Sequence, residues 1–120
     1  MVRLEAQVRA AIRDHGQRAF PREACGLVVC GAVGQVVVPM WNLAAAEDEF
    51  QFDPVELLPH LLQEKSIICF YHSHPTQAAV PSILDQAGYT YAFPHVIYSV
   101  RDDEMRGYAV QDGVWVEEHI

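Results

Sequence analysis

The order of apolar and polar positions predicts a helix followed by a β-hairpin at the start of the chain. Over residues 3–15, Leu4, Val8, Ala11 and Ile12 recur at i, i+4, i+7 and i+8, which places them on one helix face. Gly16 is the expected stop of this helix, because glycine favours helix ends. Two apolar runs of strand length then flank a four-residue segment that contains two glycines, and predict a hairpin. Its strands are expected at 27–30 and 35–40, with the loop at 31–34.

The next segment has weaker and partly conflicting signals. Residues 49–52 are expected to form a short edge strand. Asp53 and Pro54 then form a good helix start, with aspartate as the N-cap and proline at the first helical position. Pro59 conflicts with one unbroken helix, so we expect a kink there or a helix that begins near residue 58. The residues expected to face the core are Leu57, Leu58, Leu61 and Leu62.

The second half of the chain reads as a buried strand, a short helix and a β-meander. The apolar run 66–71 predicts the buried strand, and residues 82–89 predict the helix. Three further strands are expected at 94–100, 105–110 and 114–118. The order of elements predicts an α/β fold, a mixed β-sheet flanked by helices, formed by residues 1–120 as one domain.

Composition narrows the class of partner. The chain has 120 residues, of which 51% are hydrophobic, enough for a sizeable core. Its formal charge is −8, with 16 acidic residues against 8 lysines and arginines, which argues against nucleic acid and against an anionic membrane. No apolar run reaches the roughly 20 residues of a membrane span, and the first residues lack the apolar core of a secretory signal. Three sparse cysteines favour a reducing, cytoplasmic location.

The most specific chemistry lies after the central strand. His72 and His74 are two positions apart at the strand end, so both imidazoles leave it on one face, and Pro75 ends the pairing. Ser82 and Asp85 follow at the spacing of one helical turn. Two imidazoles and one carboxylate, with a fourth position left open for water, form the ligand set of a catalytic zinc site.

Each part of this pattern also has a purely structural interpretation. Ser82-x-x-Asp85 is a capping box, which would stabilise the helix N-terminus. Glu23 could be a solvated carboxylate at a strand end, and Cys25 a small buried thiol. The other histidines are expected to be packed or surface residues. These are His15, His60, His95 and His119.

Taken together, the pattern resembles the JAMM (MPN+) metalloproteases, small prokaryotic members in particular. Their motif is an upstream glutamate, then His-x-His-Pro, six residues and Ser-x-x-Asp, and this chain has Glu23, His72-Ser73-His74-Pro75 and Ser82-Ile83-Leu84-Asp85 at that spacing. The segment Pro21-Arg22-Glu23-Ala24-Cys25-Gly26 resembles the Pro-x-Glu-x-Cys-Gly signature of the small members. The resemblance implies a cytidine-deaminase-like sandwich, although the zinc-deaminase signature itself is absent.

The resemblance also implies a role for each residue. His72, His74 and Asp85 would bind one Zn²⁺, with water as the fourth ligand. Glu23 would be the general base, and Ser82 would donate a hydrogen bond to the oxyanion. The implied reaction is hydrolysis of a peptide or isopeptide bond.

The implied substrate follows from what the chain lacks. Members that cut ubiquitin chains carry insertions around the site, for which this chain has little room. Without those insertions the chain resembles a minimal catalytic core, and in the family such cores are associated with cleavage after the C-terminal Gly-Gly tail of ubiquitin-like sulfur-carrier proteins. The tail could add a strand to an edge at 49–52. The alternatives are a phage-tail-assembly peptidase, a non-catalytic scaffold subunit, and a purely structural zinc site. The sequence leaves the oligomeric state open.

Overall fold

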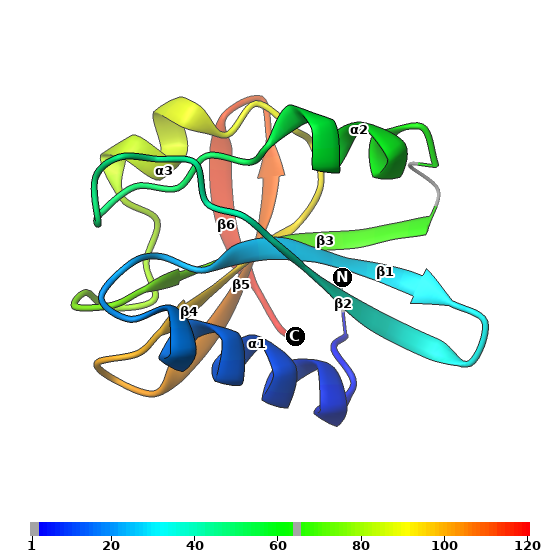
Figure 1. Cartoon of the computed structure of the whole chain (residues 1–120), viewed down its shortest axis with the longest axis horizontal. Helices are drawn as coiled ribbons and strands as arrows, with labels where there is room; N and C mark the ends of the chain where they lie inside the picture. The colour runs from blue at the N-terminus through cyan, green and yellow to red at the C-terminus, as the bar shows by residue number, and fades with distance from the viewer. Residues whose placement is uncertain (1–2, 64–65) are drawn as a thin grey trace.

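A mixed β-sheet lies at the centre of the structure, a computed structural model that describes residues 3–63 and 66–120 (Figure 1). Its strands run in the order β2-β1-β3-β4-β5-β6 across the described part of the chain, and all neighbours are antiparallel except β3 and β4. The strands are β1 (Cys25–Gly31), β2 (Gly34–Met40), β3 (Ile67–His74), β4 (His95–Ser99), β5 (Glu104–Gln111) and β6 (Val114–Glu118). The helices are α1 (Ala6–Ala19), α2 (Pro54–Leu61) and α3 (Ile83–Gly88).

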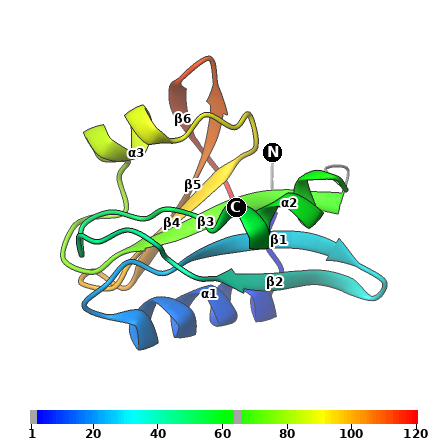
Figure 2. The same cartoon turned by 45° about the horizontal axis from the view of Figure 1, so that its top comes forward.

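Helices cover both faces of the sheet. Helix α1 lies against one face, and α2 and α3 lie over the other (Figure 1, Figure 2). Because β3 and β4 are parallel, the chain between them must cross over the sheet, and α3 belongs to that connection. The predicted α/β fold with a mixed sheet flanked by helices is confirmed.

Helix α1 continues past the residue that was expected to end it. Gly16 is buried in the helix, which runs on to Ala19. A Cβ atom at Gly16 would lie 2.7 Å from Cδ2 of Tyr98 and 3.2 Å from Cβ of Ser73. The prediction of a stop at Gly16 was therefore wrong, because this glycine allows the helix to approach the sheet closely. Val8 and Ile12 bury the predicted apolar face against the same side of the sheet.

The β1–β2 hairpin is longer, and its loop shorter, than predicted. Gly31 and Gly34 are paired across the ladder, so the loop contains two residues, Ala32 and Val33, rather than four. Gly34 has a φ of 131°, which a residue with a side chain rarely adopts. The two glycines therefore end the strands instead of forming the loop.

Residues 49–52 do not form the predicted edge strand. The segment makes one isolated bridge, between Phe52 and Asn42. The side chain of Asn42 organises it instead: its Oδ1 accepts from the backbone N–H of Gln51 at 3.0 Å, and its Nδ2 donates to the carbonyl of Glu49 at 2.9 Å. Residues 49–52 are therefore not the regular edge strand to which a substrate tail was expected to add.

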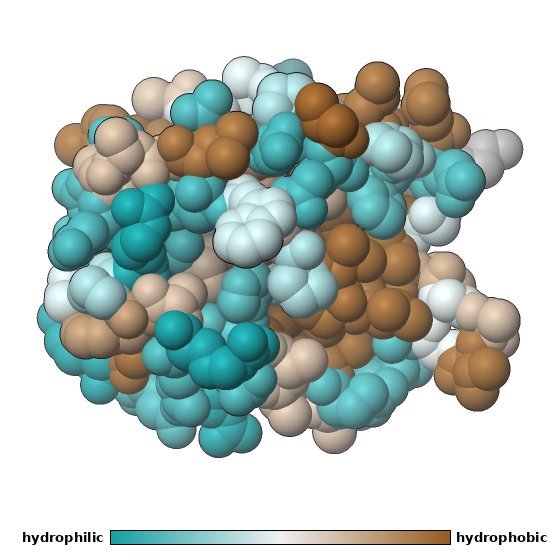
Figure 3. Space-filling view, in the orientation of Figure 1, coloured by the Kyte–Doolittle hydropathy of each residue, from teal (hydrophilic) through white to brown (hydrophobic). Residues whose placement is uncertain are grey.

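Helix α2 begins at Pro54, not near residue 58. The Asp53 side chain caps it by accepting from the N–H of Val55 at 2.9 Å, and the helix continues through Pro59. The expected core face was only partly correct, because Leu58 and Leu62 are 55% and 78% exposed. Apolar surface gathers on α2 and between it and the β1–β2 hairpin (Figure 3).

Candidate metal centre and active site

The central strand β3 positions the two histidines. It extends to His74, three residues beyond the predicted end at 71, and so contains both imidazoles. His72 and His74 are two residues apart, which places them on the same face of the sheet. Both side chains are buried, in a strand held by β1 on one side and β4 on the other. The rings therefore project from one of the most constrained parts of the molecule.

The capping box of α3 delivers the carboxylate. The Ser82 hydroxyl oxygen accepts from the N–H of Asp85 at 3.0 Å, and the Ser82 N–H donates to Oδ2 of Asp85 at 2.9 Å. The two interpretations of Ser82-x-x-Asp85 are therefore compatible, because the same bonds that start the helix also orient Asp85. Asp85 is buried, although most of this short helix is exposed.

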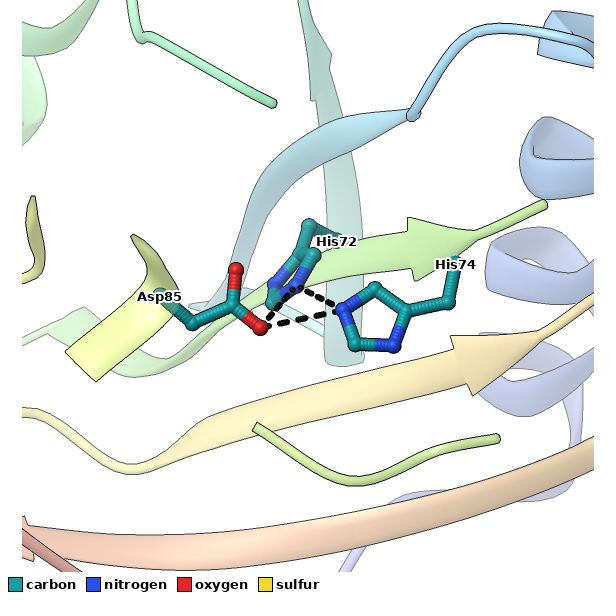
Figure 4. Close-up of side chains that lie close together, drawn as sticks. All are labelled: His72, His74 and Asp85. Atoms are coloured by element: carbon teal, nitrogen blue, oxygen red, sulfur yellow. Dashed lines mark hydrogen bonds and ion pairs between the residues drawn. The ribbon is translucent and has the colours of Figure 1, made fainter. Parts of the chain in front are cut away.

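The three side chains converge on one point (Figure 4). Nε2 of His72 lies 3.1 Å from Nε2 of His74, and Oδ2 of Asp85 lies 3.2 Å and 3.0 Å from these two nitrogens. Within the described residues, this is a grouping that could hold a metal ion. Tetrahedral zinc with ligand bonds of about 2.0–2.1 Å separates its ligands by about 3.3 Å, close to this triangle. Three electron-rich atoms this close also repel one another unless a proton or metal cation lies among them. The residues thus fit zinc.

The protonation of the donors is also compatible with a metal. Nδ1 of His74 lies 2.8 Å from the carbonyl of Ala78, to which it donates, so its Nε2 lone pair faces the triangle. Burial lowers the pKa of His72 despite the Asp85 charge, which favours the neutral ring. Burial also acts to lower the pKa of His74, but hydrogen bonds to Asp85 and Ala78 outweigh it and raise that pKa. In the metal-free protein a proton on Nε2 therefore takes the place that a metal would occupy.

Asp85 remains ionised in spite of its burial. Burial alone would raise the pKa of this carboxyl group. The charge of His72, hydrogen bonds from both imidazoles and the Ser82 N–H instead hold the pKa well below its ordinary value. The site therefore offers one carboxylate oxygen and two imidazole nitrogens.

Glu23 lies beside this triangle, just before β1. Cys25 is opposite His72 in the β1–β3 pair, so Glu23 comes opposite His74. Its side chain is 4% exposed, and its Oε1 has no hydrogen-bond partner among the described residues. Burial, with the charges of Asp85 and nearby acids, raises the pKa of Glu23 to about 8 against the opposing effect of His74. The solvated-carboxylate interpretation of Glu23 was wrong.

Cys25, two positions after Glu23, is a buried free thiol. Burial, with the charge of Glu23, raises the pKa of its thiol to about 12. Its Sγ lies 3.7 Å from the carbonyl of Trp41. The interpretation of Cys25 as a small buried thiol is confirmed.

Two surface hollows adjoin the triangle. One, which we call the α3 hollow, is lined by Phe50, Leu84, Asp85 and Tyr89, among others. The other, the Glu23 hollow, is lined by Glu23, Glu47, Asp48, His74 and Thr76, among others. The α3 hollow reaches Asp85 and the Glu23 hollow reaches His74, and acidic side chains line both hollows.

Two neighbours of His72 were not anticipated. Phe50 stacks on its ring at a centroid distance of 4.4 Å and an interplanar angle of 21°. Nε2 of His95 lies 2.6 Å from Nδ1 of His72, although His95 was expected to be an ordinary packed or surface residue. The only available signal was its place after Pro94, at the start of a strand. The other histidines stay outside the triangle, and His15 instead contacts the Tyr71 hydroxyl at 2.6 Å.

Comparison with known proteins places this arrangement in context. A family model described as prokaryotic homologs of the JAB domain matches residues 5–111. The CysO-cysteine peptidase of Mycobacterium tuberculosis is 30% identical over 129 residues, which cover 98% of this chain and 88% of the relative. A Thermus thermophilus protein named "Probable TtuB-protein conjugate cleaving protease" is 30% identical over 106 residues, covering 84% of this chain and 70% of that protein.

Solved structures share the fold. The solution structure of protein DSY2949 from Desulfitobacterium hafniense superposes with a TM-score of 0.84 at 24% identity, covering 100% of this chain and 92% of that one. A structure described as "JAMM: A Metalloprotease-like Zinc Site in the Proteasome and Signalosome" has a TM-score of 0.58 at 21% identity, covering 100% and 98%. In the described residues, no helix is both long and apolar enough to span a membrane.

Proposed function

Because this chain belongs to the prokaryotic JAB-domain family and is a JAMM-type protease, we propose that it uses zinc to hydrolyse a peptide or isopeptide bond after the C-terminal Gly-Gly tail of a ubiquitin-like or sulfur-carrier protein. One observation carries the proposal. Three buried ligand atoms converge within 3.2 Å of one another, beside the unpaired carboxyl oxygen of Glu23.

His72, His74 and Asp85 would hold the metal through Nε2, Nε2 and Oδ2. When bound, zinc supplies a Lewis acid that polarises a carbonyl group and makes a water molecule acidic near neutral pH. The protein keeps the three ligand atoms together in advance, since a β-strand and a capped helix fix their side chains. This preorganisation lowers the cost of assembling the centre.

Glu23 would move the protons. In its ionised form, its carboxylate accepts a proton from the attacking water, and in its protonated form it donates to the departing amine. The pKa of about 8 in the metal-free protein lies near neutral pH, and the positive charge of a bound metal would lower this pKa. The Glu23 side chain could therefore both accept the proton from water and donate it to the amine.

Ser82 would stabilise the negative charge that develops on the carbonyl oxygen. Its hydroxyl oxygen accepts from the Asp85 N–H, which leaves the hydroxyl hydrogen to donate. A donor aimed at a developing oxyanion contributes about 3 kcal/mol in comparable sites. Ser82 is partly exposed, so a substrate can reach it.

The two hollows suggest how a substrate lies. Glu23, which would donate to the leaving amine, lines the Glu23 hollow and not the α3 hollow, so we place the leaving group in the former. The carrier tail would then approach along the α3 hollow, beside Phe50 and Leu84. The names of the two relatives indicate conjugates of the carriers CysO and TtuB, which supports a carrier conjugate as the substrate here.

The test uses the two kinds of conjugate. The zinc-loaded protein is incubated with CysO extended by a C-terminal cysteine and with a TtuB–protein conjugate, and the products are read by intact mass. We expect a product that ends at the carrier tail from at least one of them, and none with Glu23→Gln. The M. tuberculosis peptidase serves as a positive control for the first substrate. Cleavage of neither substrate, or cleavage that survives Glu23→Gln, would contradict the proposal.

A further inference from the structure

His95 lies directly behind His72 as seen from the metal triangle. It is the first residue of β4, the parallel neighbour of β3, and its side chain is fully buried. Its Nε2 lies 2.6 Å from Nδ1 of His72, on the ring edge that does not face Asp85. The ring of His95 contacts Tyr89 edge-on at 4.6 Å and lies 5.1 Å from Trp115.

The direction of this hydrogen bond depends on what His72 does with its other nitrogen. If His72 binds a metal through the Nε2 lone pair, its ring proton must sit on Nδ1. That proton then points at Nε2 of His95, which must accept it. His95 can accept only if its own proton sits on Nδ1, a buried atom with no hydrogen-bond partner among the described residues.

The Nδ1 proton of His74 has a different kind of acceptor. Its Nδ1 faces the carbonyl of Ala78, a pure acceptor, and this holds the ring in one tautomer. His95 can donate or accept, so the His72–His95 pair can reverse. Without metal, His72 can donate from Nε2 to Asp85 and accept from His95. With metal, both protons move to the Nδ1 atoms.

We propose that His95 is a positioning residue, which accepts the Nδ1 proton of His72 and so holds that ring in the orientation and tautomer that bind the metal. This role depends on the proposed function, since it presupposes the metal centre. Partners of this kind, when removed, typically weaken metal binding by about 10- to 100-fold. A carboxylate or carbonyl is the usual partner, and here a second, neutral imidazole takes its place.

The competing explanation is that His95 only fills space among aromatic rings. Two substitutions separate the explanations. His95→Leu replaces the imidazole by an apolar side chain of similar volume and so removes the acceptor, whereas His95→Gln offers an amide oxygen that can accept. The matched control is His15→Leu, which removes a histidine whose partner is Tyr71, on the α1 side of the sheet.

The test measures zinc affinity by competition with a chelator, after the metal-free variants are shown to be folded. We expect His95→Leu to bind zinc about 10- to 100-fold more weakly, His95→Gln to recover most of the affinity, and His15→Leu to match the wild type. Equal zinc affinities in His95→Leu and the wild type would overturn the proposed role of His95 but leave the proposed function standing. A wild-type protein that binds no zinc would overturn the proposed function, and this role with it.

A second measurement needs no substitution. Nitrogen-15 NMR of the histidine rings in the zinc-loaded wild type reports which nitrogen of each ring carries the proton. We expect His72 and His95 both to be protonated on Nδ1. A proton on Nε2 of His95 would overturn the proposal even if His95→Leu fails to fold.

Discussion

The side-chain amide of Asn42 donates a hydrogen bond to the backbone carbonyl of Glu23 at 3.0 Å. The same amide bonds the carbonyl of Glu49, and its oxygen accepts from the N–H groups of Ala44 and Gln51. Asn42 therefore ties the segment before β1 to the segment that carries Phe50. One residue outside the metal triangle thus links the proposed base to a wall of the α3 hollow.

Asn42→Ala should reduce turnover more than zinc affinity. The substitution leaves four backbone groups without this partner, which should cost about 1–3 kcal/mol of stability and allow Glu23 to move. We expect kcat to fall at least about tenfold, because small misplacements of a catalytic group are costly. Steady-state kinetics and chelator competition measure the two quantities. A variant with wild-type kcat would show that Asn42 does not position Glu23.

Glu23→Gln should separate metal binding from catalysis. Gln has nearly the same shape as Glu but cannot take up a proton, so hydrolysis should fall by about 10²- to 10⁴-fold. Zinc content, measured by elemental analysis, should stay near one ion per chain, because Glu23 is not among the three ligands. Full activity in this variant would remove Glu23 as the base.

His74→Ala should abolish the stabilisation that zinc provides. Zinc at 100 times its dissociation constant adds about 2.7 kcal/mol to the unfolding free energy of a protein that binds it only when folded. Thermal unfolding with and without zinc should therefore show a rise in Tm for the wild type and none for His74→Ala. His60→Ala is the control, since His60 lies on α2 outside the triangle. An equal rise in His74→Ala would contradict its role as a ligand.

Ser82→Ala should affect both folding and catalysis, and a second cap separates the two effects. Loss of the cap should cost about 1 kcal/mol of stability, and loss of the oxyanion donor about 10²- to 10³-fold in kcat. Asp53→Ala removes the cap of α2, where Asp53 accepts from Val55, and should cost similar stability without loss of kcat. If both variants lose activity alike, the effect of Ser82 is on folding alone.

The raised pKa of Glu23 predicts how stability changes with pH in the metal-free protein. Its pKa rises from 4.5 to about 8 on folding, so between these values the folded state binds more protons than the unfolded state. Stability should therefore fall as pH rises through this window. Glu23→Gln lacks this effect, so its advantage over the wild type should grow by roughly 3 to 5 kcal/mol from pH 4.5 to 8. Chemical denaturation of chelator-treated protein across this range measures the gap. A constant gap would contradict the raised pKa.

Local patterns predicted the three ligand positions because they depend on short-range geometry. His72 and His74 share a face because strand side chains alternate, and Asp85 is oriented by hydrogen bonds to a residue three positions earlier. Their convergence within 3.2 Å is confirmed, while the roles of metal ligand, base and oxyanion donor remain predictions.

Two predictions about the fold were wrong because the local sequence did not reveal a contact with a distant residue. Gly16 was taken as a helix stop, but the same lack of a side chain allows close packing against Tyr98. Residues 49–52 were expected to form a strand, but the Asn42 side chain binds the Glu49 carbonyl and the Gln51 N–H instead. Neither outcome follows from spacing along the chain.

The sequence by itself determined which side chains could form a metal site, because the two histidines and the capped aspartate are fixed by local periodicity. Only the tertiary structure decided what surrounds them. The contact between His72 and His95 spans 23 positions and depends on the register of two parallel strands, and no local pattern specifies which residue of β4 lies beside β3. The bond from Asn42 to Glu23 likewise forms only when separate segments pack together, since hydrogen-bond partners distant in sequence are set by the fold as a whole.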